Sequence, residues 1–199
     1  MIKFDGFTLS HYSEVLKDKR LITIVLNTLF MALLSSLIST IIGTLGAIGI
    51  YYIKNRNKKA VLLSLNNVLM VSPDVIIGAS FLIFFTFIGF KLGFMSVLIS
   101  HVAFSIPIVV LMVLPKLYEI NPSMIFAARD LGASERMVLT RIILPFISPG
   151  ILAGYFMAFT YSLDDFAVTF FVTGNGFSTL AVEIYSRARQ GISLSINAL

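Results

Sequence analysis

The sequence predicts an all-α, polytopic transmembrane helical bundle. Hydrophobic residues make up 57% of the 199 positions, charged residues make up only 13%, and the mean hydropathy is +0.94. A soluble domain carries about 25% charged residues. The chain also contains several charge-free runs of the length, about 20 residues, that crosses the hydrocarbon core of a bilayer as a helix. We therefore expect lipid to be the main solvent of this protein.

Four charge-poor runs predict four spans within one domain that covers residues 1–199. The runs at 21–53, 92–115 and 142–163 contain no Asp, Glu, Lys or Arg, and the run at 60–90 contains one such residue, Asp74. None of them resembles a removable signal peptide, whose apolar core is about 7–15 residues long. The expected spans lie at approximately 22–50, 64–89, 93–115 and 142–164.

The outer segment at 165–199 follows the fourth span. Its apolar part is interrupted by Gly174, Asn175 and Gly176, a sequence typical of a turn. We therefore expect an irregular segment here rather than a fifth span.

The basic residues do not decide the orientation of the chain. If the loops at 54–59 and 116–141 lie inside, eight basic residues are inside and seven are outside, which is almost a tie under the positive-inside rule. A basic N-terminal tail would then have to cross the membrane. A six-span protein without its first and last spans removes this difficulty, and we expect the chain to be such a shortened form.

The first expected span carries small residues at every fourth position, Ser35, Ser39, Gly43 and Ala47. Such stripes let transmembrane helices approach backbone to backbone. We interpret this stripe as a packing surface rather than a ligand site.

The loop at 116–141 is the only long polar stretch between expected spans. Asn121 followed by Pro122 predicts the start of a short helix, since Asn caps helices and Pro favours their first position. Gly132 is expected to end that helix, and Ser134 to cap a second one. Such a pair forms a knob on the membrane surface, which is either a docking element or an amphipathic connector without a partner.

The loop sequence AARDLGASERMVLTRIILP resembles the EAA motif of the permeases of ATP-binding cassette (ABC) importers. The matching positions are Ala127, Ala128, Gly132 and the Ile-Leu-Pro run that ends at Pro145, whereas Phe126 stands where the motif has Glu. The resemblance implies an ABC-importer permease fold with four of six spans present. It also implies that this loop, including Asp130 and Ala133, docks on a cytoplasmic ATP-binding subunit.

Further segments resemble the C-type permease subunit of spermidine/putrescine importers. They include VSPDVIIGASFLIFF, LGFMSVLISHVAFSIPIVV and SLDDFAVTFFVTG. This resemblance implies a polyamine substrate, a second permease subunit and an extracytoplasmic solute-binding protein. Permeases for iron, thiamine and sulfate share much of the pattern and stay open as alternatives.

Ionisable residues at membrane depth usually face a cavity or a partner, so they are the candidates for a substrate pathway. Asp74 follows Pro73, where a local break in the helix is expected. It is either a cation-attracting site or the partner of His101 or a nearby hydroxyl. At the end of the fourth span, a carboxylate beside an aromatic ring suits an organic cation, although interfacial placement would also explain these residues. The candidate pathway residues are Asp74, Tyr161, Asp164, Asp165 and Thr169.

Several functions are disfavoured by what the sequence lacks. It has no phosphate-binding loop, no H-E-x-x-H zinc helix and no nucleophile elbow. We therefore expect that the chain is not an enzyme and that it binds no cofactor or metal. ATP hydrolysis is expected on a separate subunit. The net charge of +5 lies in loops, so we expect no nucleic-acid partner.

The expected function is that of a multi-pass permease subunit in a bacterial cytoplasmic membrane, which moves polyamines by alternating access. An ATP-independent transporter with a proton relay through Asp74 and His101 is the first alternative. A scaffold fragment without transport activity is the second.

Overall fold

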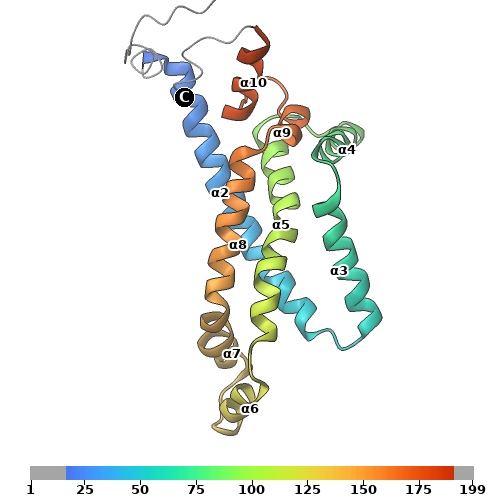
Figure 1. Ribbon diagram of the computed structural model, residues 1–199, viewed down its shortest axis with the longest axis vertical. Helices are drawn as coiled ribbons and strands as arrows, with labels where there is room; N and C mark the ends of the chain where they lie inside the picture. The colour runs from blue at the N-terminus through green and yellow to red at the C-terminus, as the bar shows by residue number, and fades with distance from the viewer. Residues whose placement is uncertain (1–16, 191–199) are drawn as a thin grey trace, which may run out of the picture.

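The computed structural model describes residues 17–190, and this part of the chain is helical with short connections. Three long helices form its centre: α2 (Lys19–Tyr52), α5 (Phe94–Tyr118) and α8 (Leu144–Asp164). They run side by side along the long axis of the molecule (Figure 1). Each is apolar and long enough to cross a membrane. For α8 this length includes the short helical stretch before it, which begins at Glu135.

The faces of α2 explain why these helices associate in lipid. Its buried face carries small and hydroxyl residues, including Ser35, Ser39, Gly43 and Ala47, as the stripe predicted. Its exposed face carries large apolar side chains such as Leu26 and Leu45. Small residues at helix contacts and large apolar residues facing outward are the arrangement that a bilayer favours.

Glycines mark the points of closest approach between the three helices. A Cβ atom on Gly43 of α2 would lie 2.7 Å from the Cβ of Val109 on α5. A Cβ on Gly150 of α8 would lie 2.9 Å from the backbone oxygen of Met112, also on α5. The apolar core continues below these contacts through Val113, Leu117 and Ile147.

The expected span at 64–89 is corrected by the structure, because it consists of two helices. α3 (Arg56–Val71) and α4 (Asp74–Phe87) are bent by 105° at a short break. Pro73 causes the break, since proline has no N–H to donate and pushes the residue before it out of the helical region. Ser72 accordingly has ψ 138°. The described residues therefore contain three candidate spans, or four if the bent pair counts as one.

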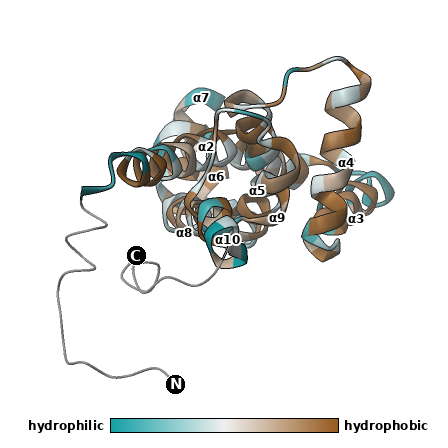
Figure 2. Ribbon diagram, turned by 90° about the horizontal axis from the view of Figure 1, so that it is seen from above, coloured by the Kyte–Doolittle hydropathy of each residue, from teal (hydrophilic) through white to brown (hydrophobic). Residues whose placement is uncertain are grey.

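The bent pair stands beside the bundle rather than within it. Figures 1 and 2 show α3 and α4 to one side of α2, α5 and α8. No residue of α3 is buried, and Asn66 on α3 donates from its side-chain amide to the Pro107 carbonyl on α5 at 3.3 Å. α4 packs more firmly, against α9 (Ala167–Val172), where the backbone of Gly78 meets Phe171 and Val168.

The segment after the fourth span is more helical than the sequence predicts. α9 and α10 (Leu180–Gln190) flank the expected turn, in which Gly174 and Gly176 have positive φ. The short helices are held by packing on α4 and α2, which local sequence does not reveal. The end of the expected outer segment, from residue 191, lies outside the described residues.

The loop between α5 and α8 folds as predicted into two short helices, α6 (Pro122–Asp130) and α7 (Glu135–Val138). The Asn121 side chain accepts a hydrogen bond from the Ser123 N–H, and the Ser134 side chain accepts one from Met137. A five-residue π-helix, η1 (Leu139–Ile143), joins α7 to α8. The two prolines of α8 follow it. Ser148 donates to the Pro145 carbonyl, the group that Pro149 leaves without its usual helical donor.

Candidate functional site

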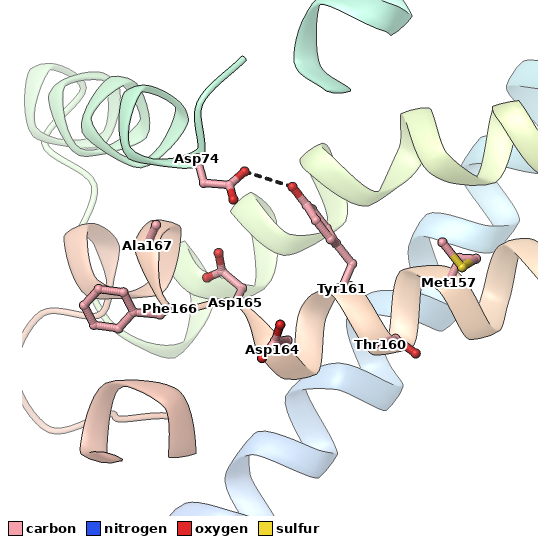
Figure 3. A pocket seen from close by; sticks show the side chains of 8 residues that line it. All are labelled: Asp74, Met157, Thr160, Tyr161, Asp164, Asp165, Phe166 and Ala167. Carbon is pink, nitrogen blue, oxygen red and sulfur yellow. Dashed lines mark hydrogen bonds between the residues drawn. The ribbon is translucent and has the colours of Figure 1, made fainter. Parts of the chain in front are cut away.

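An acidic pocket lies where α4, α8 and α9 meet. It has a volume of about 390 Å³ and is lined by three of the ten carboxylates of the chain, together with two aromatic rings. No Lys or Arg lines it. Figure 3 shows the lining side chains, which are Asp74, Met157, Thr160, Tyr161, Asp164, Asp165, Phe166 and Ala167.

Asp74 is placed in this pocket by the break between α3 and α4. It is the first residue of α4, a position where the helix dipole favours a carboxylate. The Tyr161 hydroxyl on α8 donates to its Oδ1 at 2.9 Å (Figure 3). The sequence left His101 or a nearby hydroxyl as the partner of Asp74. In the structure the partner is a hydroxyl, that of Tyr161.

Asp165 reaches the same pocket from the break between α8 and α9. Its Oδ2 accepts from both the N–H and the hydroxyl of Thr169 at 2.8 Å, and its Oδ1 accepts from the Val168 N–H at 3.2 Å. The carboxylate thereby caps the first turn of α9. Its side chain is only 7% exposed, so Asp165 is largely committed to the fold.

The two adjacent aspartates therefore occupy different environments. Asp164, the last residue of α8, is exposed and lines the pocket, whereas Asp165 is turned inward. Thr169 is fully buried behind Asp165 and does not line the pocket. The sequence places these residues close together along the chain, but it does not show which of the two carboxylates faces solvent and which is buried.

His101, which the sequence offered as an alternative partner of Asp74, is not among the residues that line the pocket. It lies on α5 with none of its side chain exposed, and its ring contacts Ser162, Thr169 and Asp165. Among the described residues no hydrogen bond joins it to Asp74. The Phe104 ring packs on both His101 and Tyr161, and its centroid lies 4.9 Å from the His101 ring and 5.0 Å from the Tyr161 ring. The relay from Asp74 to His101 that the sequence suggested is therefore not formed.

The α6–α7 loop lies at the opposite end of the bundle from α10 (Figure 1). Its turn is closed by backbone bonds from Gly132 N–H to the Arg129 carbonyl and from Ala133 N–H to the Ala128 carbonyl, at 2.8 and 2.9 Å. Gly132 has φ +83°, a conformation that residues other than glycine rarely adopt. An ion pair between Arg129 and Glu135 at 2.9 Å bridges the two helices.

The loop residues divide into an inward and an outward face. Ala128 and Ala133 are half-buried against the bundle core, with Ile125 beneath them. The outward face is strongly apolar for a loop, since Phe126 is 59% and Leu131 90% exposed. Of the residues that the sequence predicts for docking, Ala127, Asp130, Gly132 and Pro145 are exposed.

At the other end, an ionic network attaches α10 to the start of α2. Glu183 is buried and accepts from Arg187 Nε at 2.8 Å and from Arg20 Nη2 at 3.2 Å. Arg187 also donates to Asp18 at 3.1 Å. Within residues 17–190 no group of three or more His, Asp or Glu side chains is arranged to hold a metal ion.

Comparison with known proteins gives a consistent result. Residues 39–194 match the family described as binding-protein-dependent transport system inner membrane component. The chain is 40% identical over its whole length to the spermidine/putrescine transport system permease protein PotC of Escherichia coli K12, of which it covers 75%. It is 35% identical to the protein of the same name from Haemophilus influenzae, of which it covers 77%.

Two further relatives extend the comparison. The putrescine transport system permease protein PotI of Escherichia coli K12 is 32% identical over 98% of this chain and 71% of its own length. Among solved structures, an inward-facing form of the MetNI methionine ABC transporter superposes with a TM-score of 0.75, covering 89% of this chain and 84% of the other. Identity to it is 20%, so this likeness concerns the fold alone.

Proposed function

The chain belongs to the family of binding-protein-dependent transport system inner membrane components, and on that premise we propose that it lines the path of an ATP-driven polyamine importer. It is a multi-pass permease of a bacterial-type cytoplasmic membrane. Permeases of this kind act with an ATP-hydrolysing subunit, another permease and a solute-binding protein. The proposal concerns the substrate and the residues that meet it.

The acidic pocket is the observation that carries the substrate assignment. Asp74 and Asp164 present carboxylates at its surface, Tyr161 and Phe166 present rings, and no basic side chain lines it. Ammonium groups are attracted by carboxylates and by aromatic faces. A flexible chain with several ammonium groups satisfies both, whereas an anion such as sulfate would be repelled. The names of the 32–40% identical relatives point to the same cargo.

We place the contact with the ATPase on the α6–α7 loop. Its exposed face carries two large apolar side chains, Phe126 and Leu131, and an apolar surface of this kind supports contact with another protein. Ala128 and Ala133 pack on the bundle core, so they suit the transmission of movement into α5 and α8 rather than direct contact. Docking of the solute-binding protein is proposed for the opposite end, around α10.

Uptake of radiolabelled spermidine by the assembled transporter tests the substrate assignment. Asp74→Asn and Asp164→Asn should each raise the apparent KM, by about two- to fivefold, the size of one accessible charge interaction. Glu119→Gln is the matched control, because Glu119 is an exposed acid that pairs with Lys116 outside the pocket.

The KM of the Glu119→Gln variant should stay at the wild-type value. Equal spermidine KM values in the wild type and both pocket variants would contradict the assignment of the pocket. Absence of spermidine uptake by the wild-type transporter would contradict the polyamine function itself.

A further inference from the structure

A basic surface without acidic partners lies in and just after the connection between α2 and α3. Its four residues are Lys54, Arg56, Lys58 and Lys59, and all but the last are exposed. No Asp or Glu occurs between Asp18 and Asp74. Within residues 17–190, every ion pair uses basic residues from elsewhere in the chain. This concentrated positive charge attracts an anionic partner.

The basic surface lies beside a group of tyrosines at one end of the bundle. The ring of Tyr51 near the end of α2 lies 5.5 Å from the ring of Tyr118 at the end of α5, and Tyr52 is exposed beside them. Lys59 Nζ donates to the Tyr51 carbonyl at 3.2 Å and lies 4.9 Å from the Tyr118 ring centroid. Tyrosines of this kind gather where a membrane meets water. The connection is at the same end as the α6–α7 loop (Figure 1).

A stripe of leucines on α3 leads from Lys58 toward the bend with α4. Leu62, Leu65 and Leu69 follow Lys58 by 4, 7 and 11 residues, a spacing that places all four on one face of a helix. Leu62 and Leu65 are exposed. The distance from Lys58 to Leu69 along the helix is about 17 Å at 1.5 Å per residue. This is close to half of the hydrocarbon core, which is about 30 Å thick, so the stripe is about one leaflet long.

The leucine stripe ends at a hollow inside the 105° bend between α3 and α4. The hollow has a volume of about 430 Å³ and contains no charged lining residue. Two serines contribute to its wall, and the other lining residues are Leu69, Ile76, Ile77, Phe81 and Phe84. A basic surface at the interface, followed by an apolar stripe and an apolar hollow, matches the headgroup and the hydrocarbon of a lipid in their order across a leaflet.

We propose that α3 and its bend bind one anionic phospholipid from the leaflet on the side of the α6–α7 loop. The phosphate contacts Lys58 and its basic neighbours, one acyl chain follows the leucine stripe, and the end of that chain enters the hollow. The lipid covers a helix that buries no residue against the protein, and it supports the bend that places Asp74 in the acidic pocket. The site does not depend on which cargo the permease carries.

Lipid binding to the full chain, purified in detergent and followed by native mass spectrometry, tests the headgroup contact. Dioleoylphosphatidylglycerol, which is anionic, should bind more tightly than dioleoylphosphatidylcholine, which has the same acyl chains and no net charge. Lys58→Gln should weaken binding of phosphatidylglycerol by about fivefold, the loss expected for one basic residue near an anionic lipid. Lys91→Gln is the matched control, because Lys91 is an exposed basic residue between α4 and α5, and it should bind both lipids like the wild type.

A second pair of variants tests the acyl chain. Ser80 is exposed and lines the hollow, so Ser80→Trp should fill the hollow and weaken the binding of both lipids several-fold. Ser64→Trp is the control, because Ser64 is exposed on a different face of α3 from the leucine stripe, and it should not change lipid binding. Glycerol phosphate has a phosphate but no acyl chain, and it should not displace the bound lipid.

Three results would overturn the proposal. Equal affinity of the wild type for the two lipids, or unchanged phosphatidylglycerol binding in Lys58→Gln, would assign the basic surface to a protein partner instead. Displacement of the lipid by glycerol phosphate would reduce the site to one for phosphate alone. Lipid binding that is the same in Ser80→Trp and the wild type would remove the hollow from the site.

Discussion

The hydroxyl of Tyr161 donates to Oδ1 of Asp74 at 2.9 Å, although 87 residues separate them in the chain. The bond joins the first residue of α4 to the last turns of α8, and it is drawn as a dashed line in Figure 3. α3 has no buried residue, so the bent pair is joined to the rest of the molecule mainly through α4, and this bond adds to the packing of α4 on its neighbours. It also keeps one carboxylate at the wall of the pocket.

The Tyr161–Asp74 bond predicts energetic coupling between the two residues. Tyr161→Phe keeps the ring on Phe104 and removes only the hydroxyl, so its effect on spermidine KM should disappear in an Asp74→Ala background, where the hydroxyl has no side-chain acceptor. Groups that share a hydrogen bond show coupling energies of about 0.5–3 kcal/mol. Uptake kinetics of the two single variants and the double variant measure this, and strictly additive effects would contradict it.

The close approach of α2 and α5 predicts a large cost for one added methyl group. A Cβ on Gly43 would lie 2.7 Å from Val109, and overpacking of this kind costs about 1–3 kcal/mol. Gly43→Ala should therefore lower the unfolding temperature of the detergent-purified protein. Gly49→Ala on the same helix is the control: nothing lies within 4 Å of its Cβ, and alanine favours helix by up to about 1 kcal/mol. A lower unfolding temperature for both variants would argue against a specific contact.

The turn between α6 and α7 predicts a conformational requirement at Gly132. Its φ is +83° and a Cβ would meet nothing within 4 Å, so the backbone rather than space excludes side chains. Gly132→Val should strain the turn by about 1–2 kcal/mol and uncouple ATP hydrolysis from uptake. In Gly132→Asn, ATP hydrolysis should remain coupled to uptake, because Asn tolerates positive φ. Equal coupling ratios in the two variants would count against docking through this loop.

The ionic network at α10 predicts unequal effects of its two acids. Glu183→Gln leaves Arg20 and Arg187 facing a buried neutral amide, so amide hydrogens of α10 should exchange faster. Asp18→Asn should have a smaller effect, since Asp18 is more exposed than Glu183. Hydrogen exchange followed by mass spectrometry distinguishes the two variants. Faster exchange in Asp18→Asn than in Glu183→Gln would show that the network is centred elsewhere.

The same network has a predicted pH dependence. A hydrogen bond from Arg187 lowers the pKa of the Asp18 carboxyl below its ordinary value of 3.8. A carboxyl whose pKa is lower in the folded than in the unfolded state stabilises the fold. This stabilisation is complete above the pKa of the unfolded state and is lost as the pH falls through the pKa of the folded state. Protection of α10 against exchange should therefore persist under mild acid and decline below pH 3.8. In Asp18→Asn, this part of the decline should be absent.

Local sequence was sufficient wherever one residue controls its own backbone. Asn121, Pro122, Gly132 and Ser134 predict where both short helices of the loop begin and where the first one ends, and the structure confirms these points. Pro73 predicts the break beside Asp74. The stripe from Ser35 to Ala47 predicts the buried face of α2, because helical periodicity alone places those residues together.

The sequence by itself thus determined the membrane class, the long helices, the loop and the neighbourhood of the acidic pocket, since hydropathy, caps and helix breakers act over a few residues. Only the tertiary structure decided which groups pair. The 105° turn brings Asp74 to Tyr161, and the α8–α9 break turns Asp165 to His101 and leaves Asp164 exposed. Such partners are dozens of residues apart, and their choice depends on how whole helices pack, which no local pattern encodes.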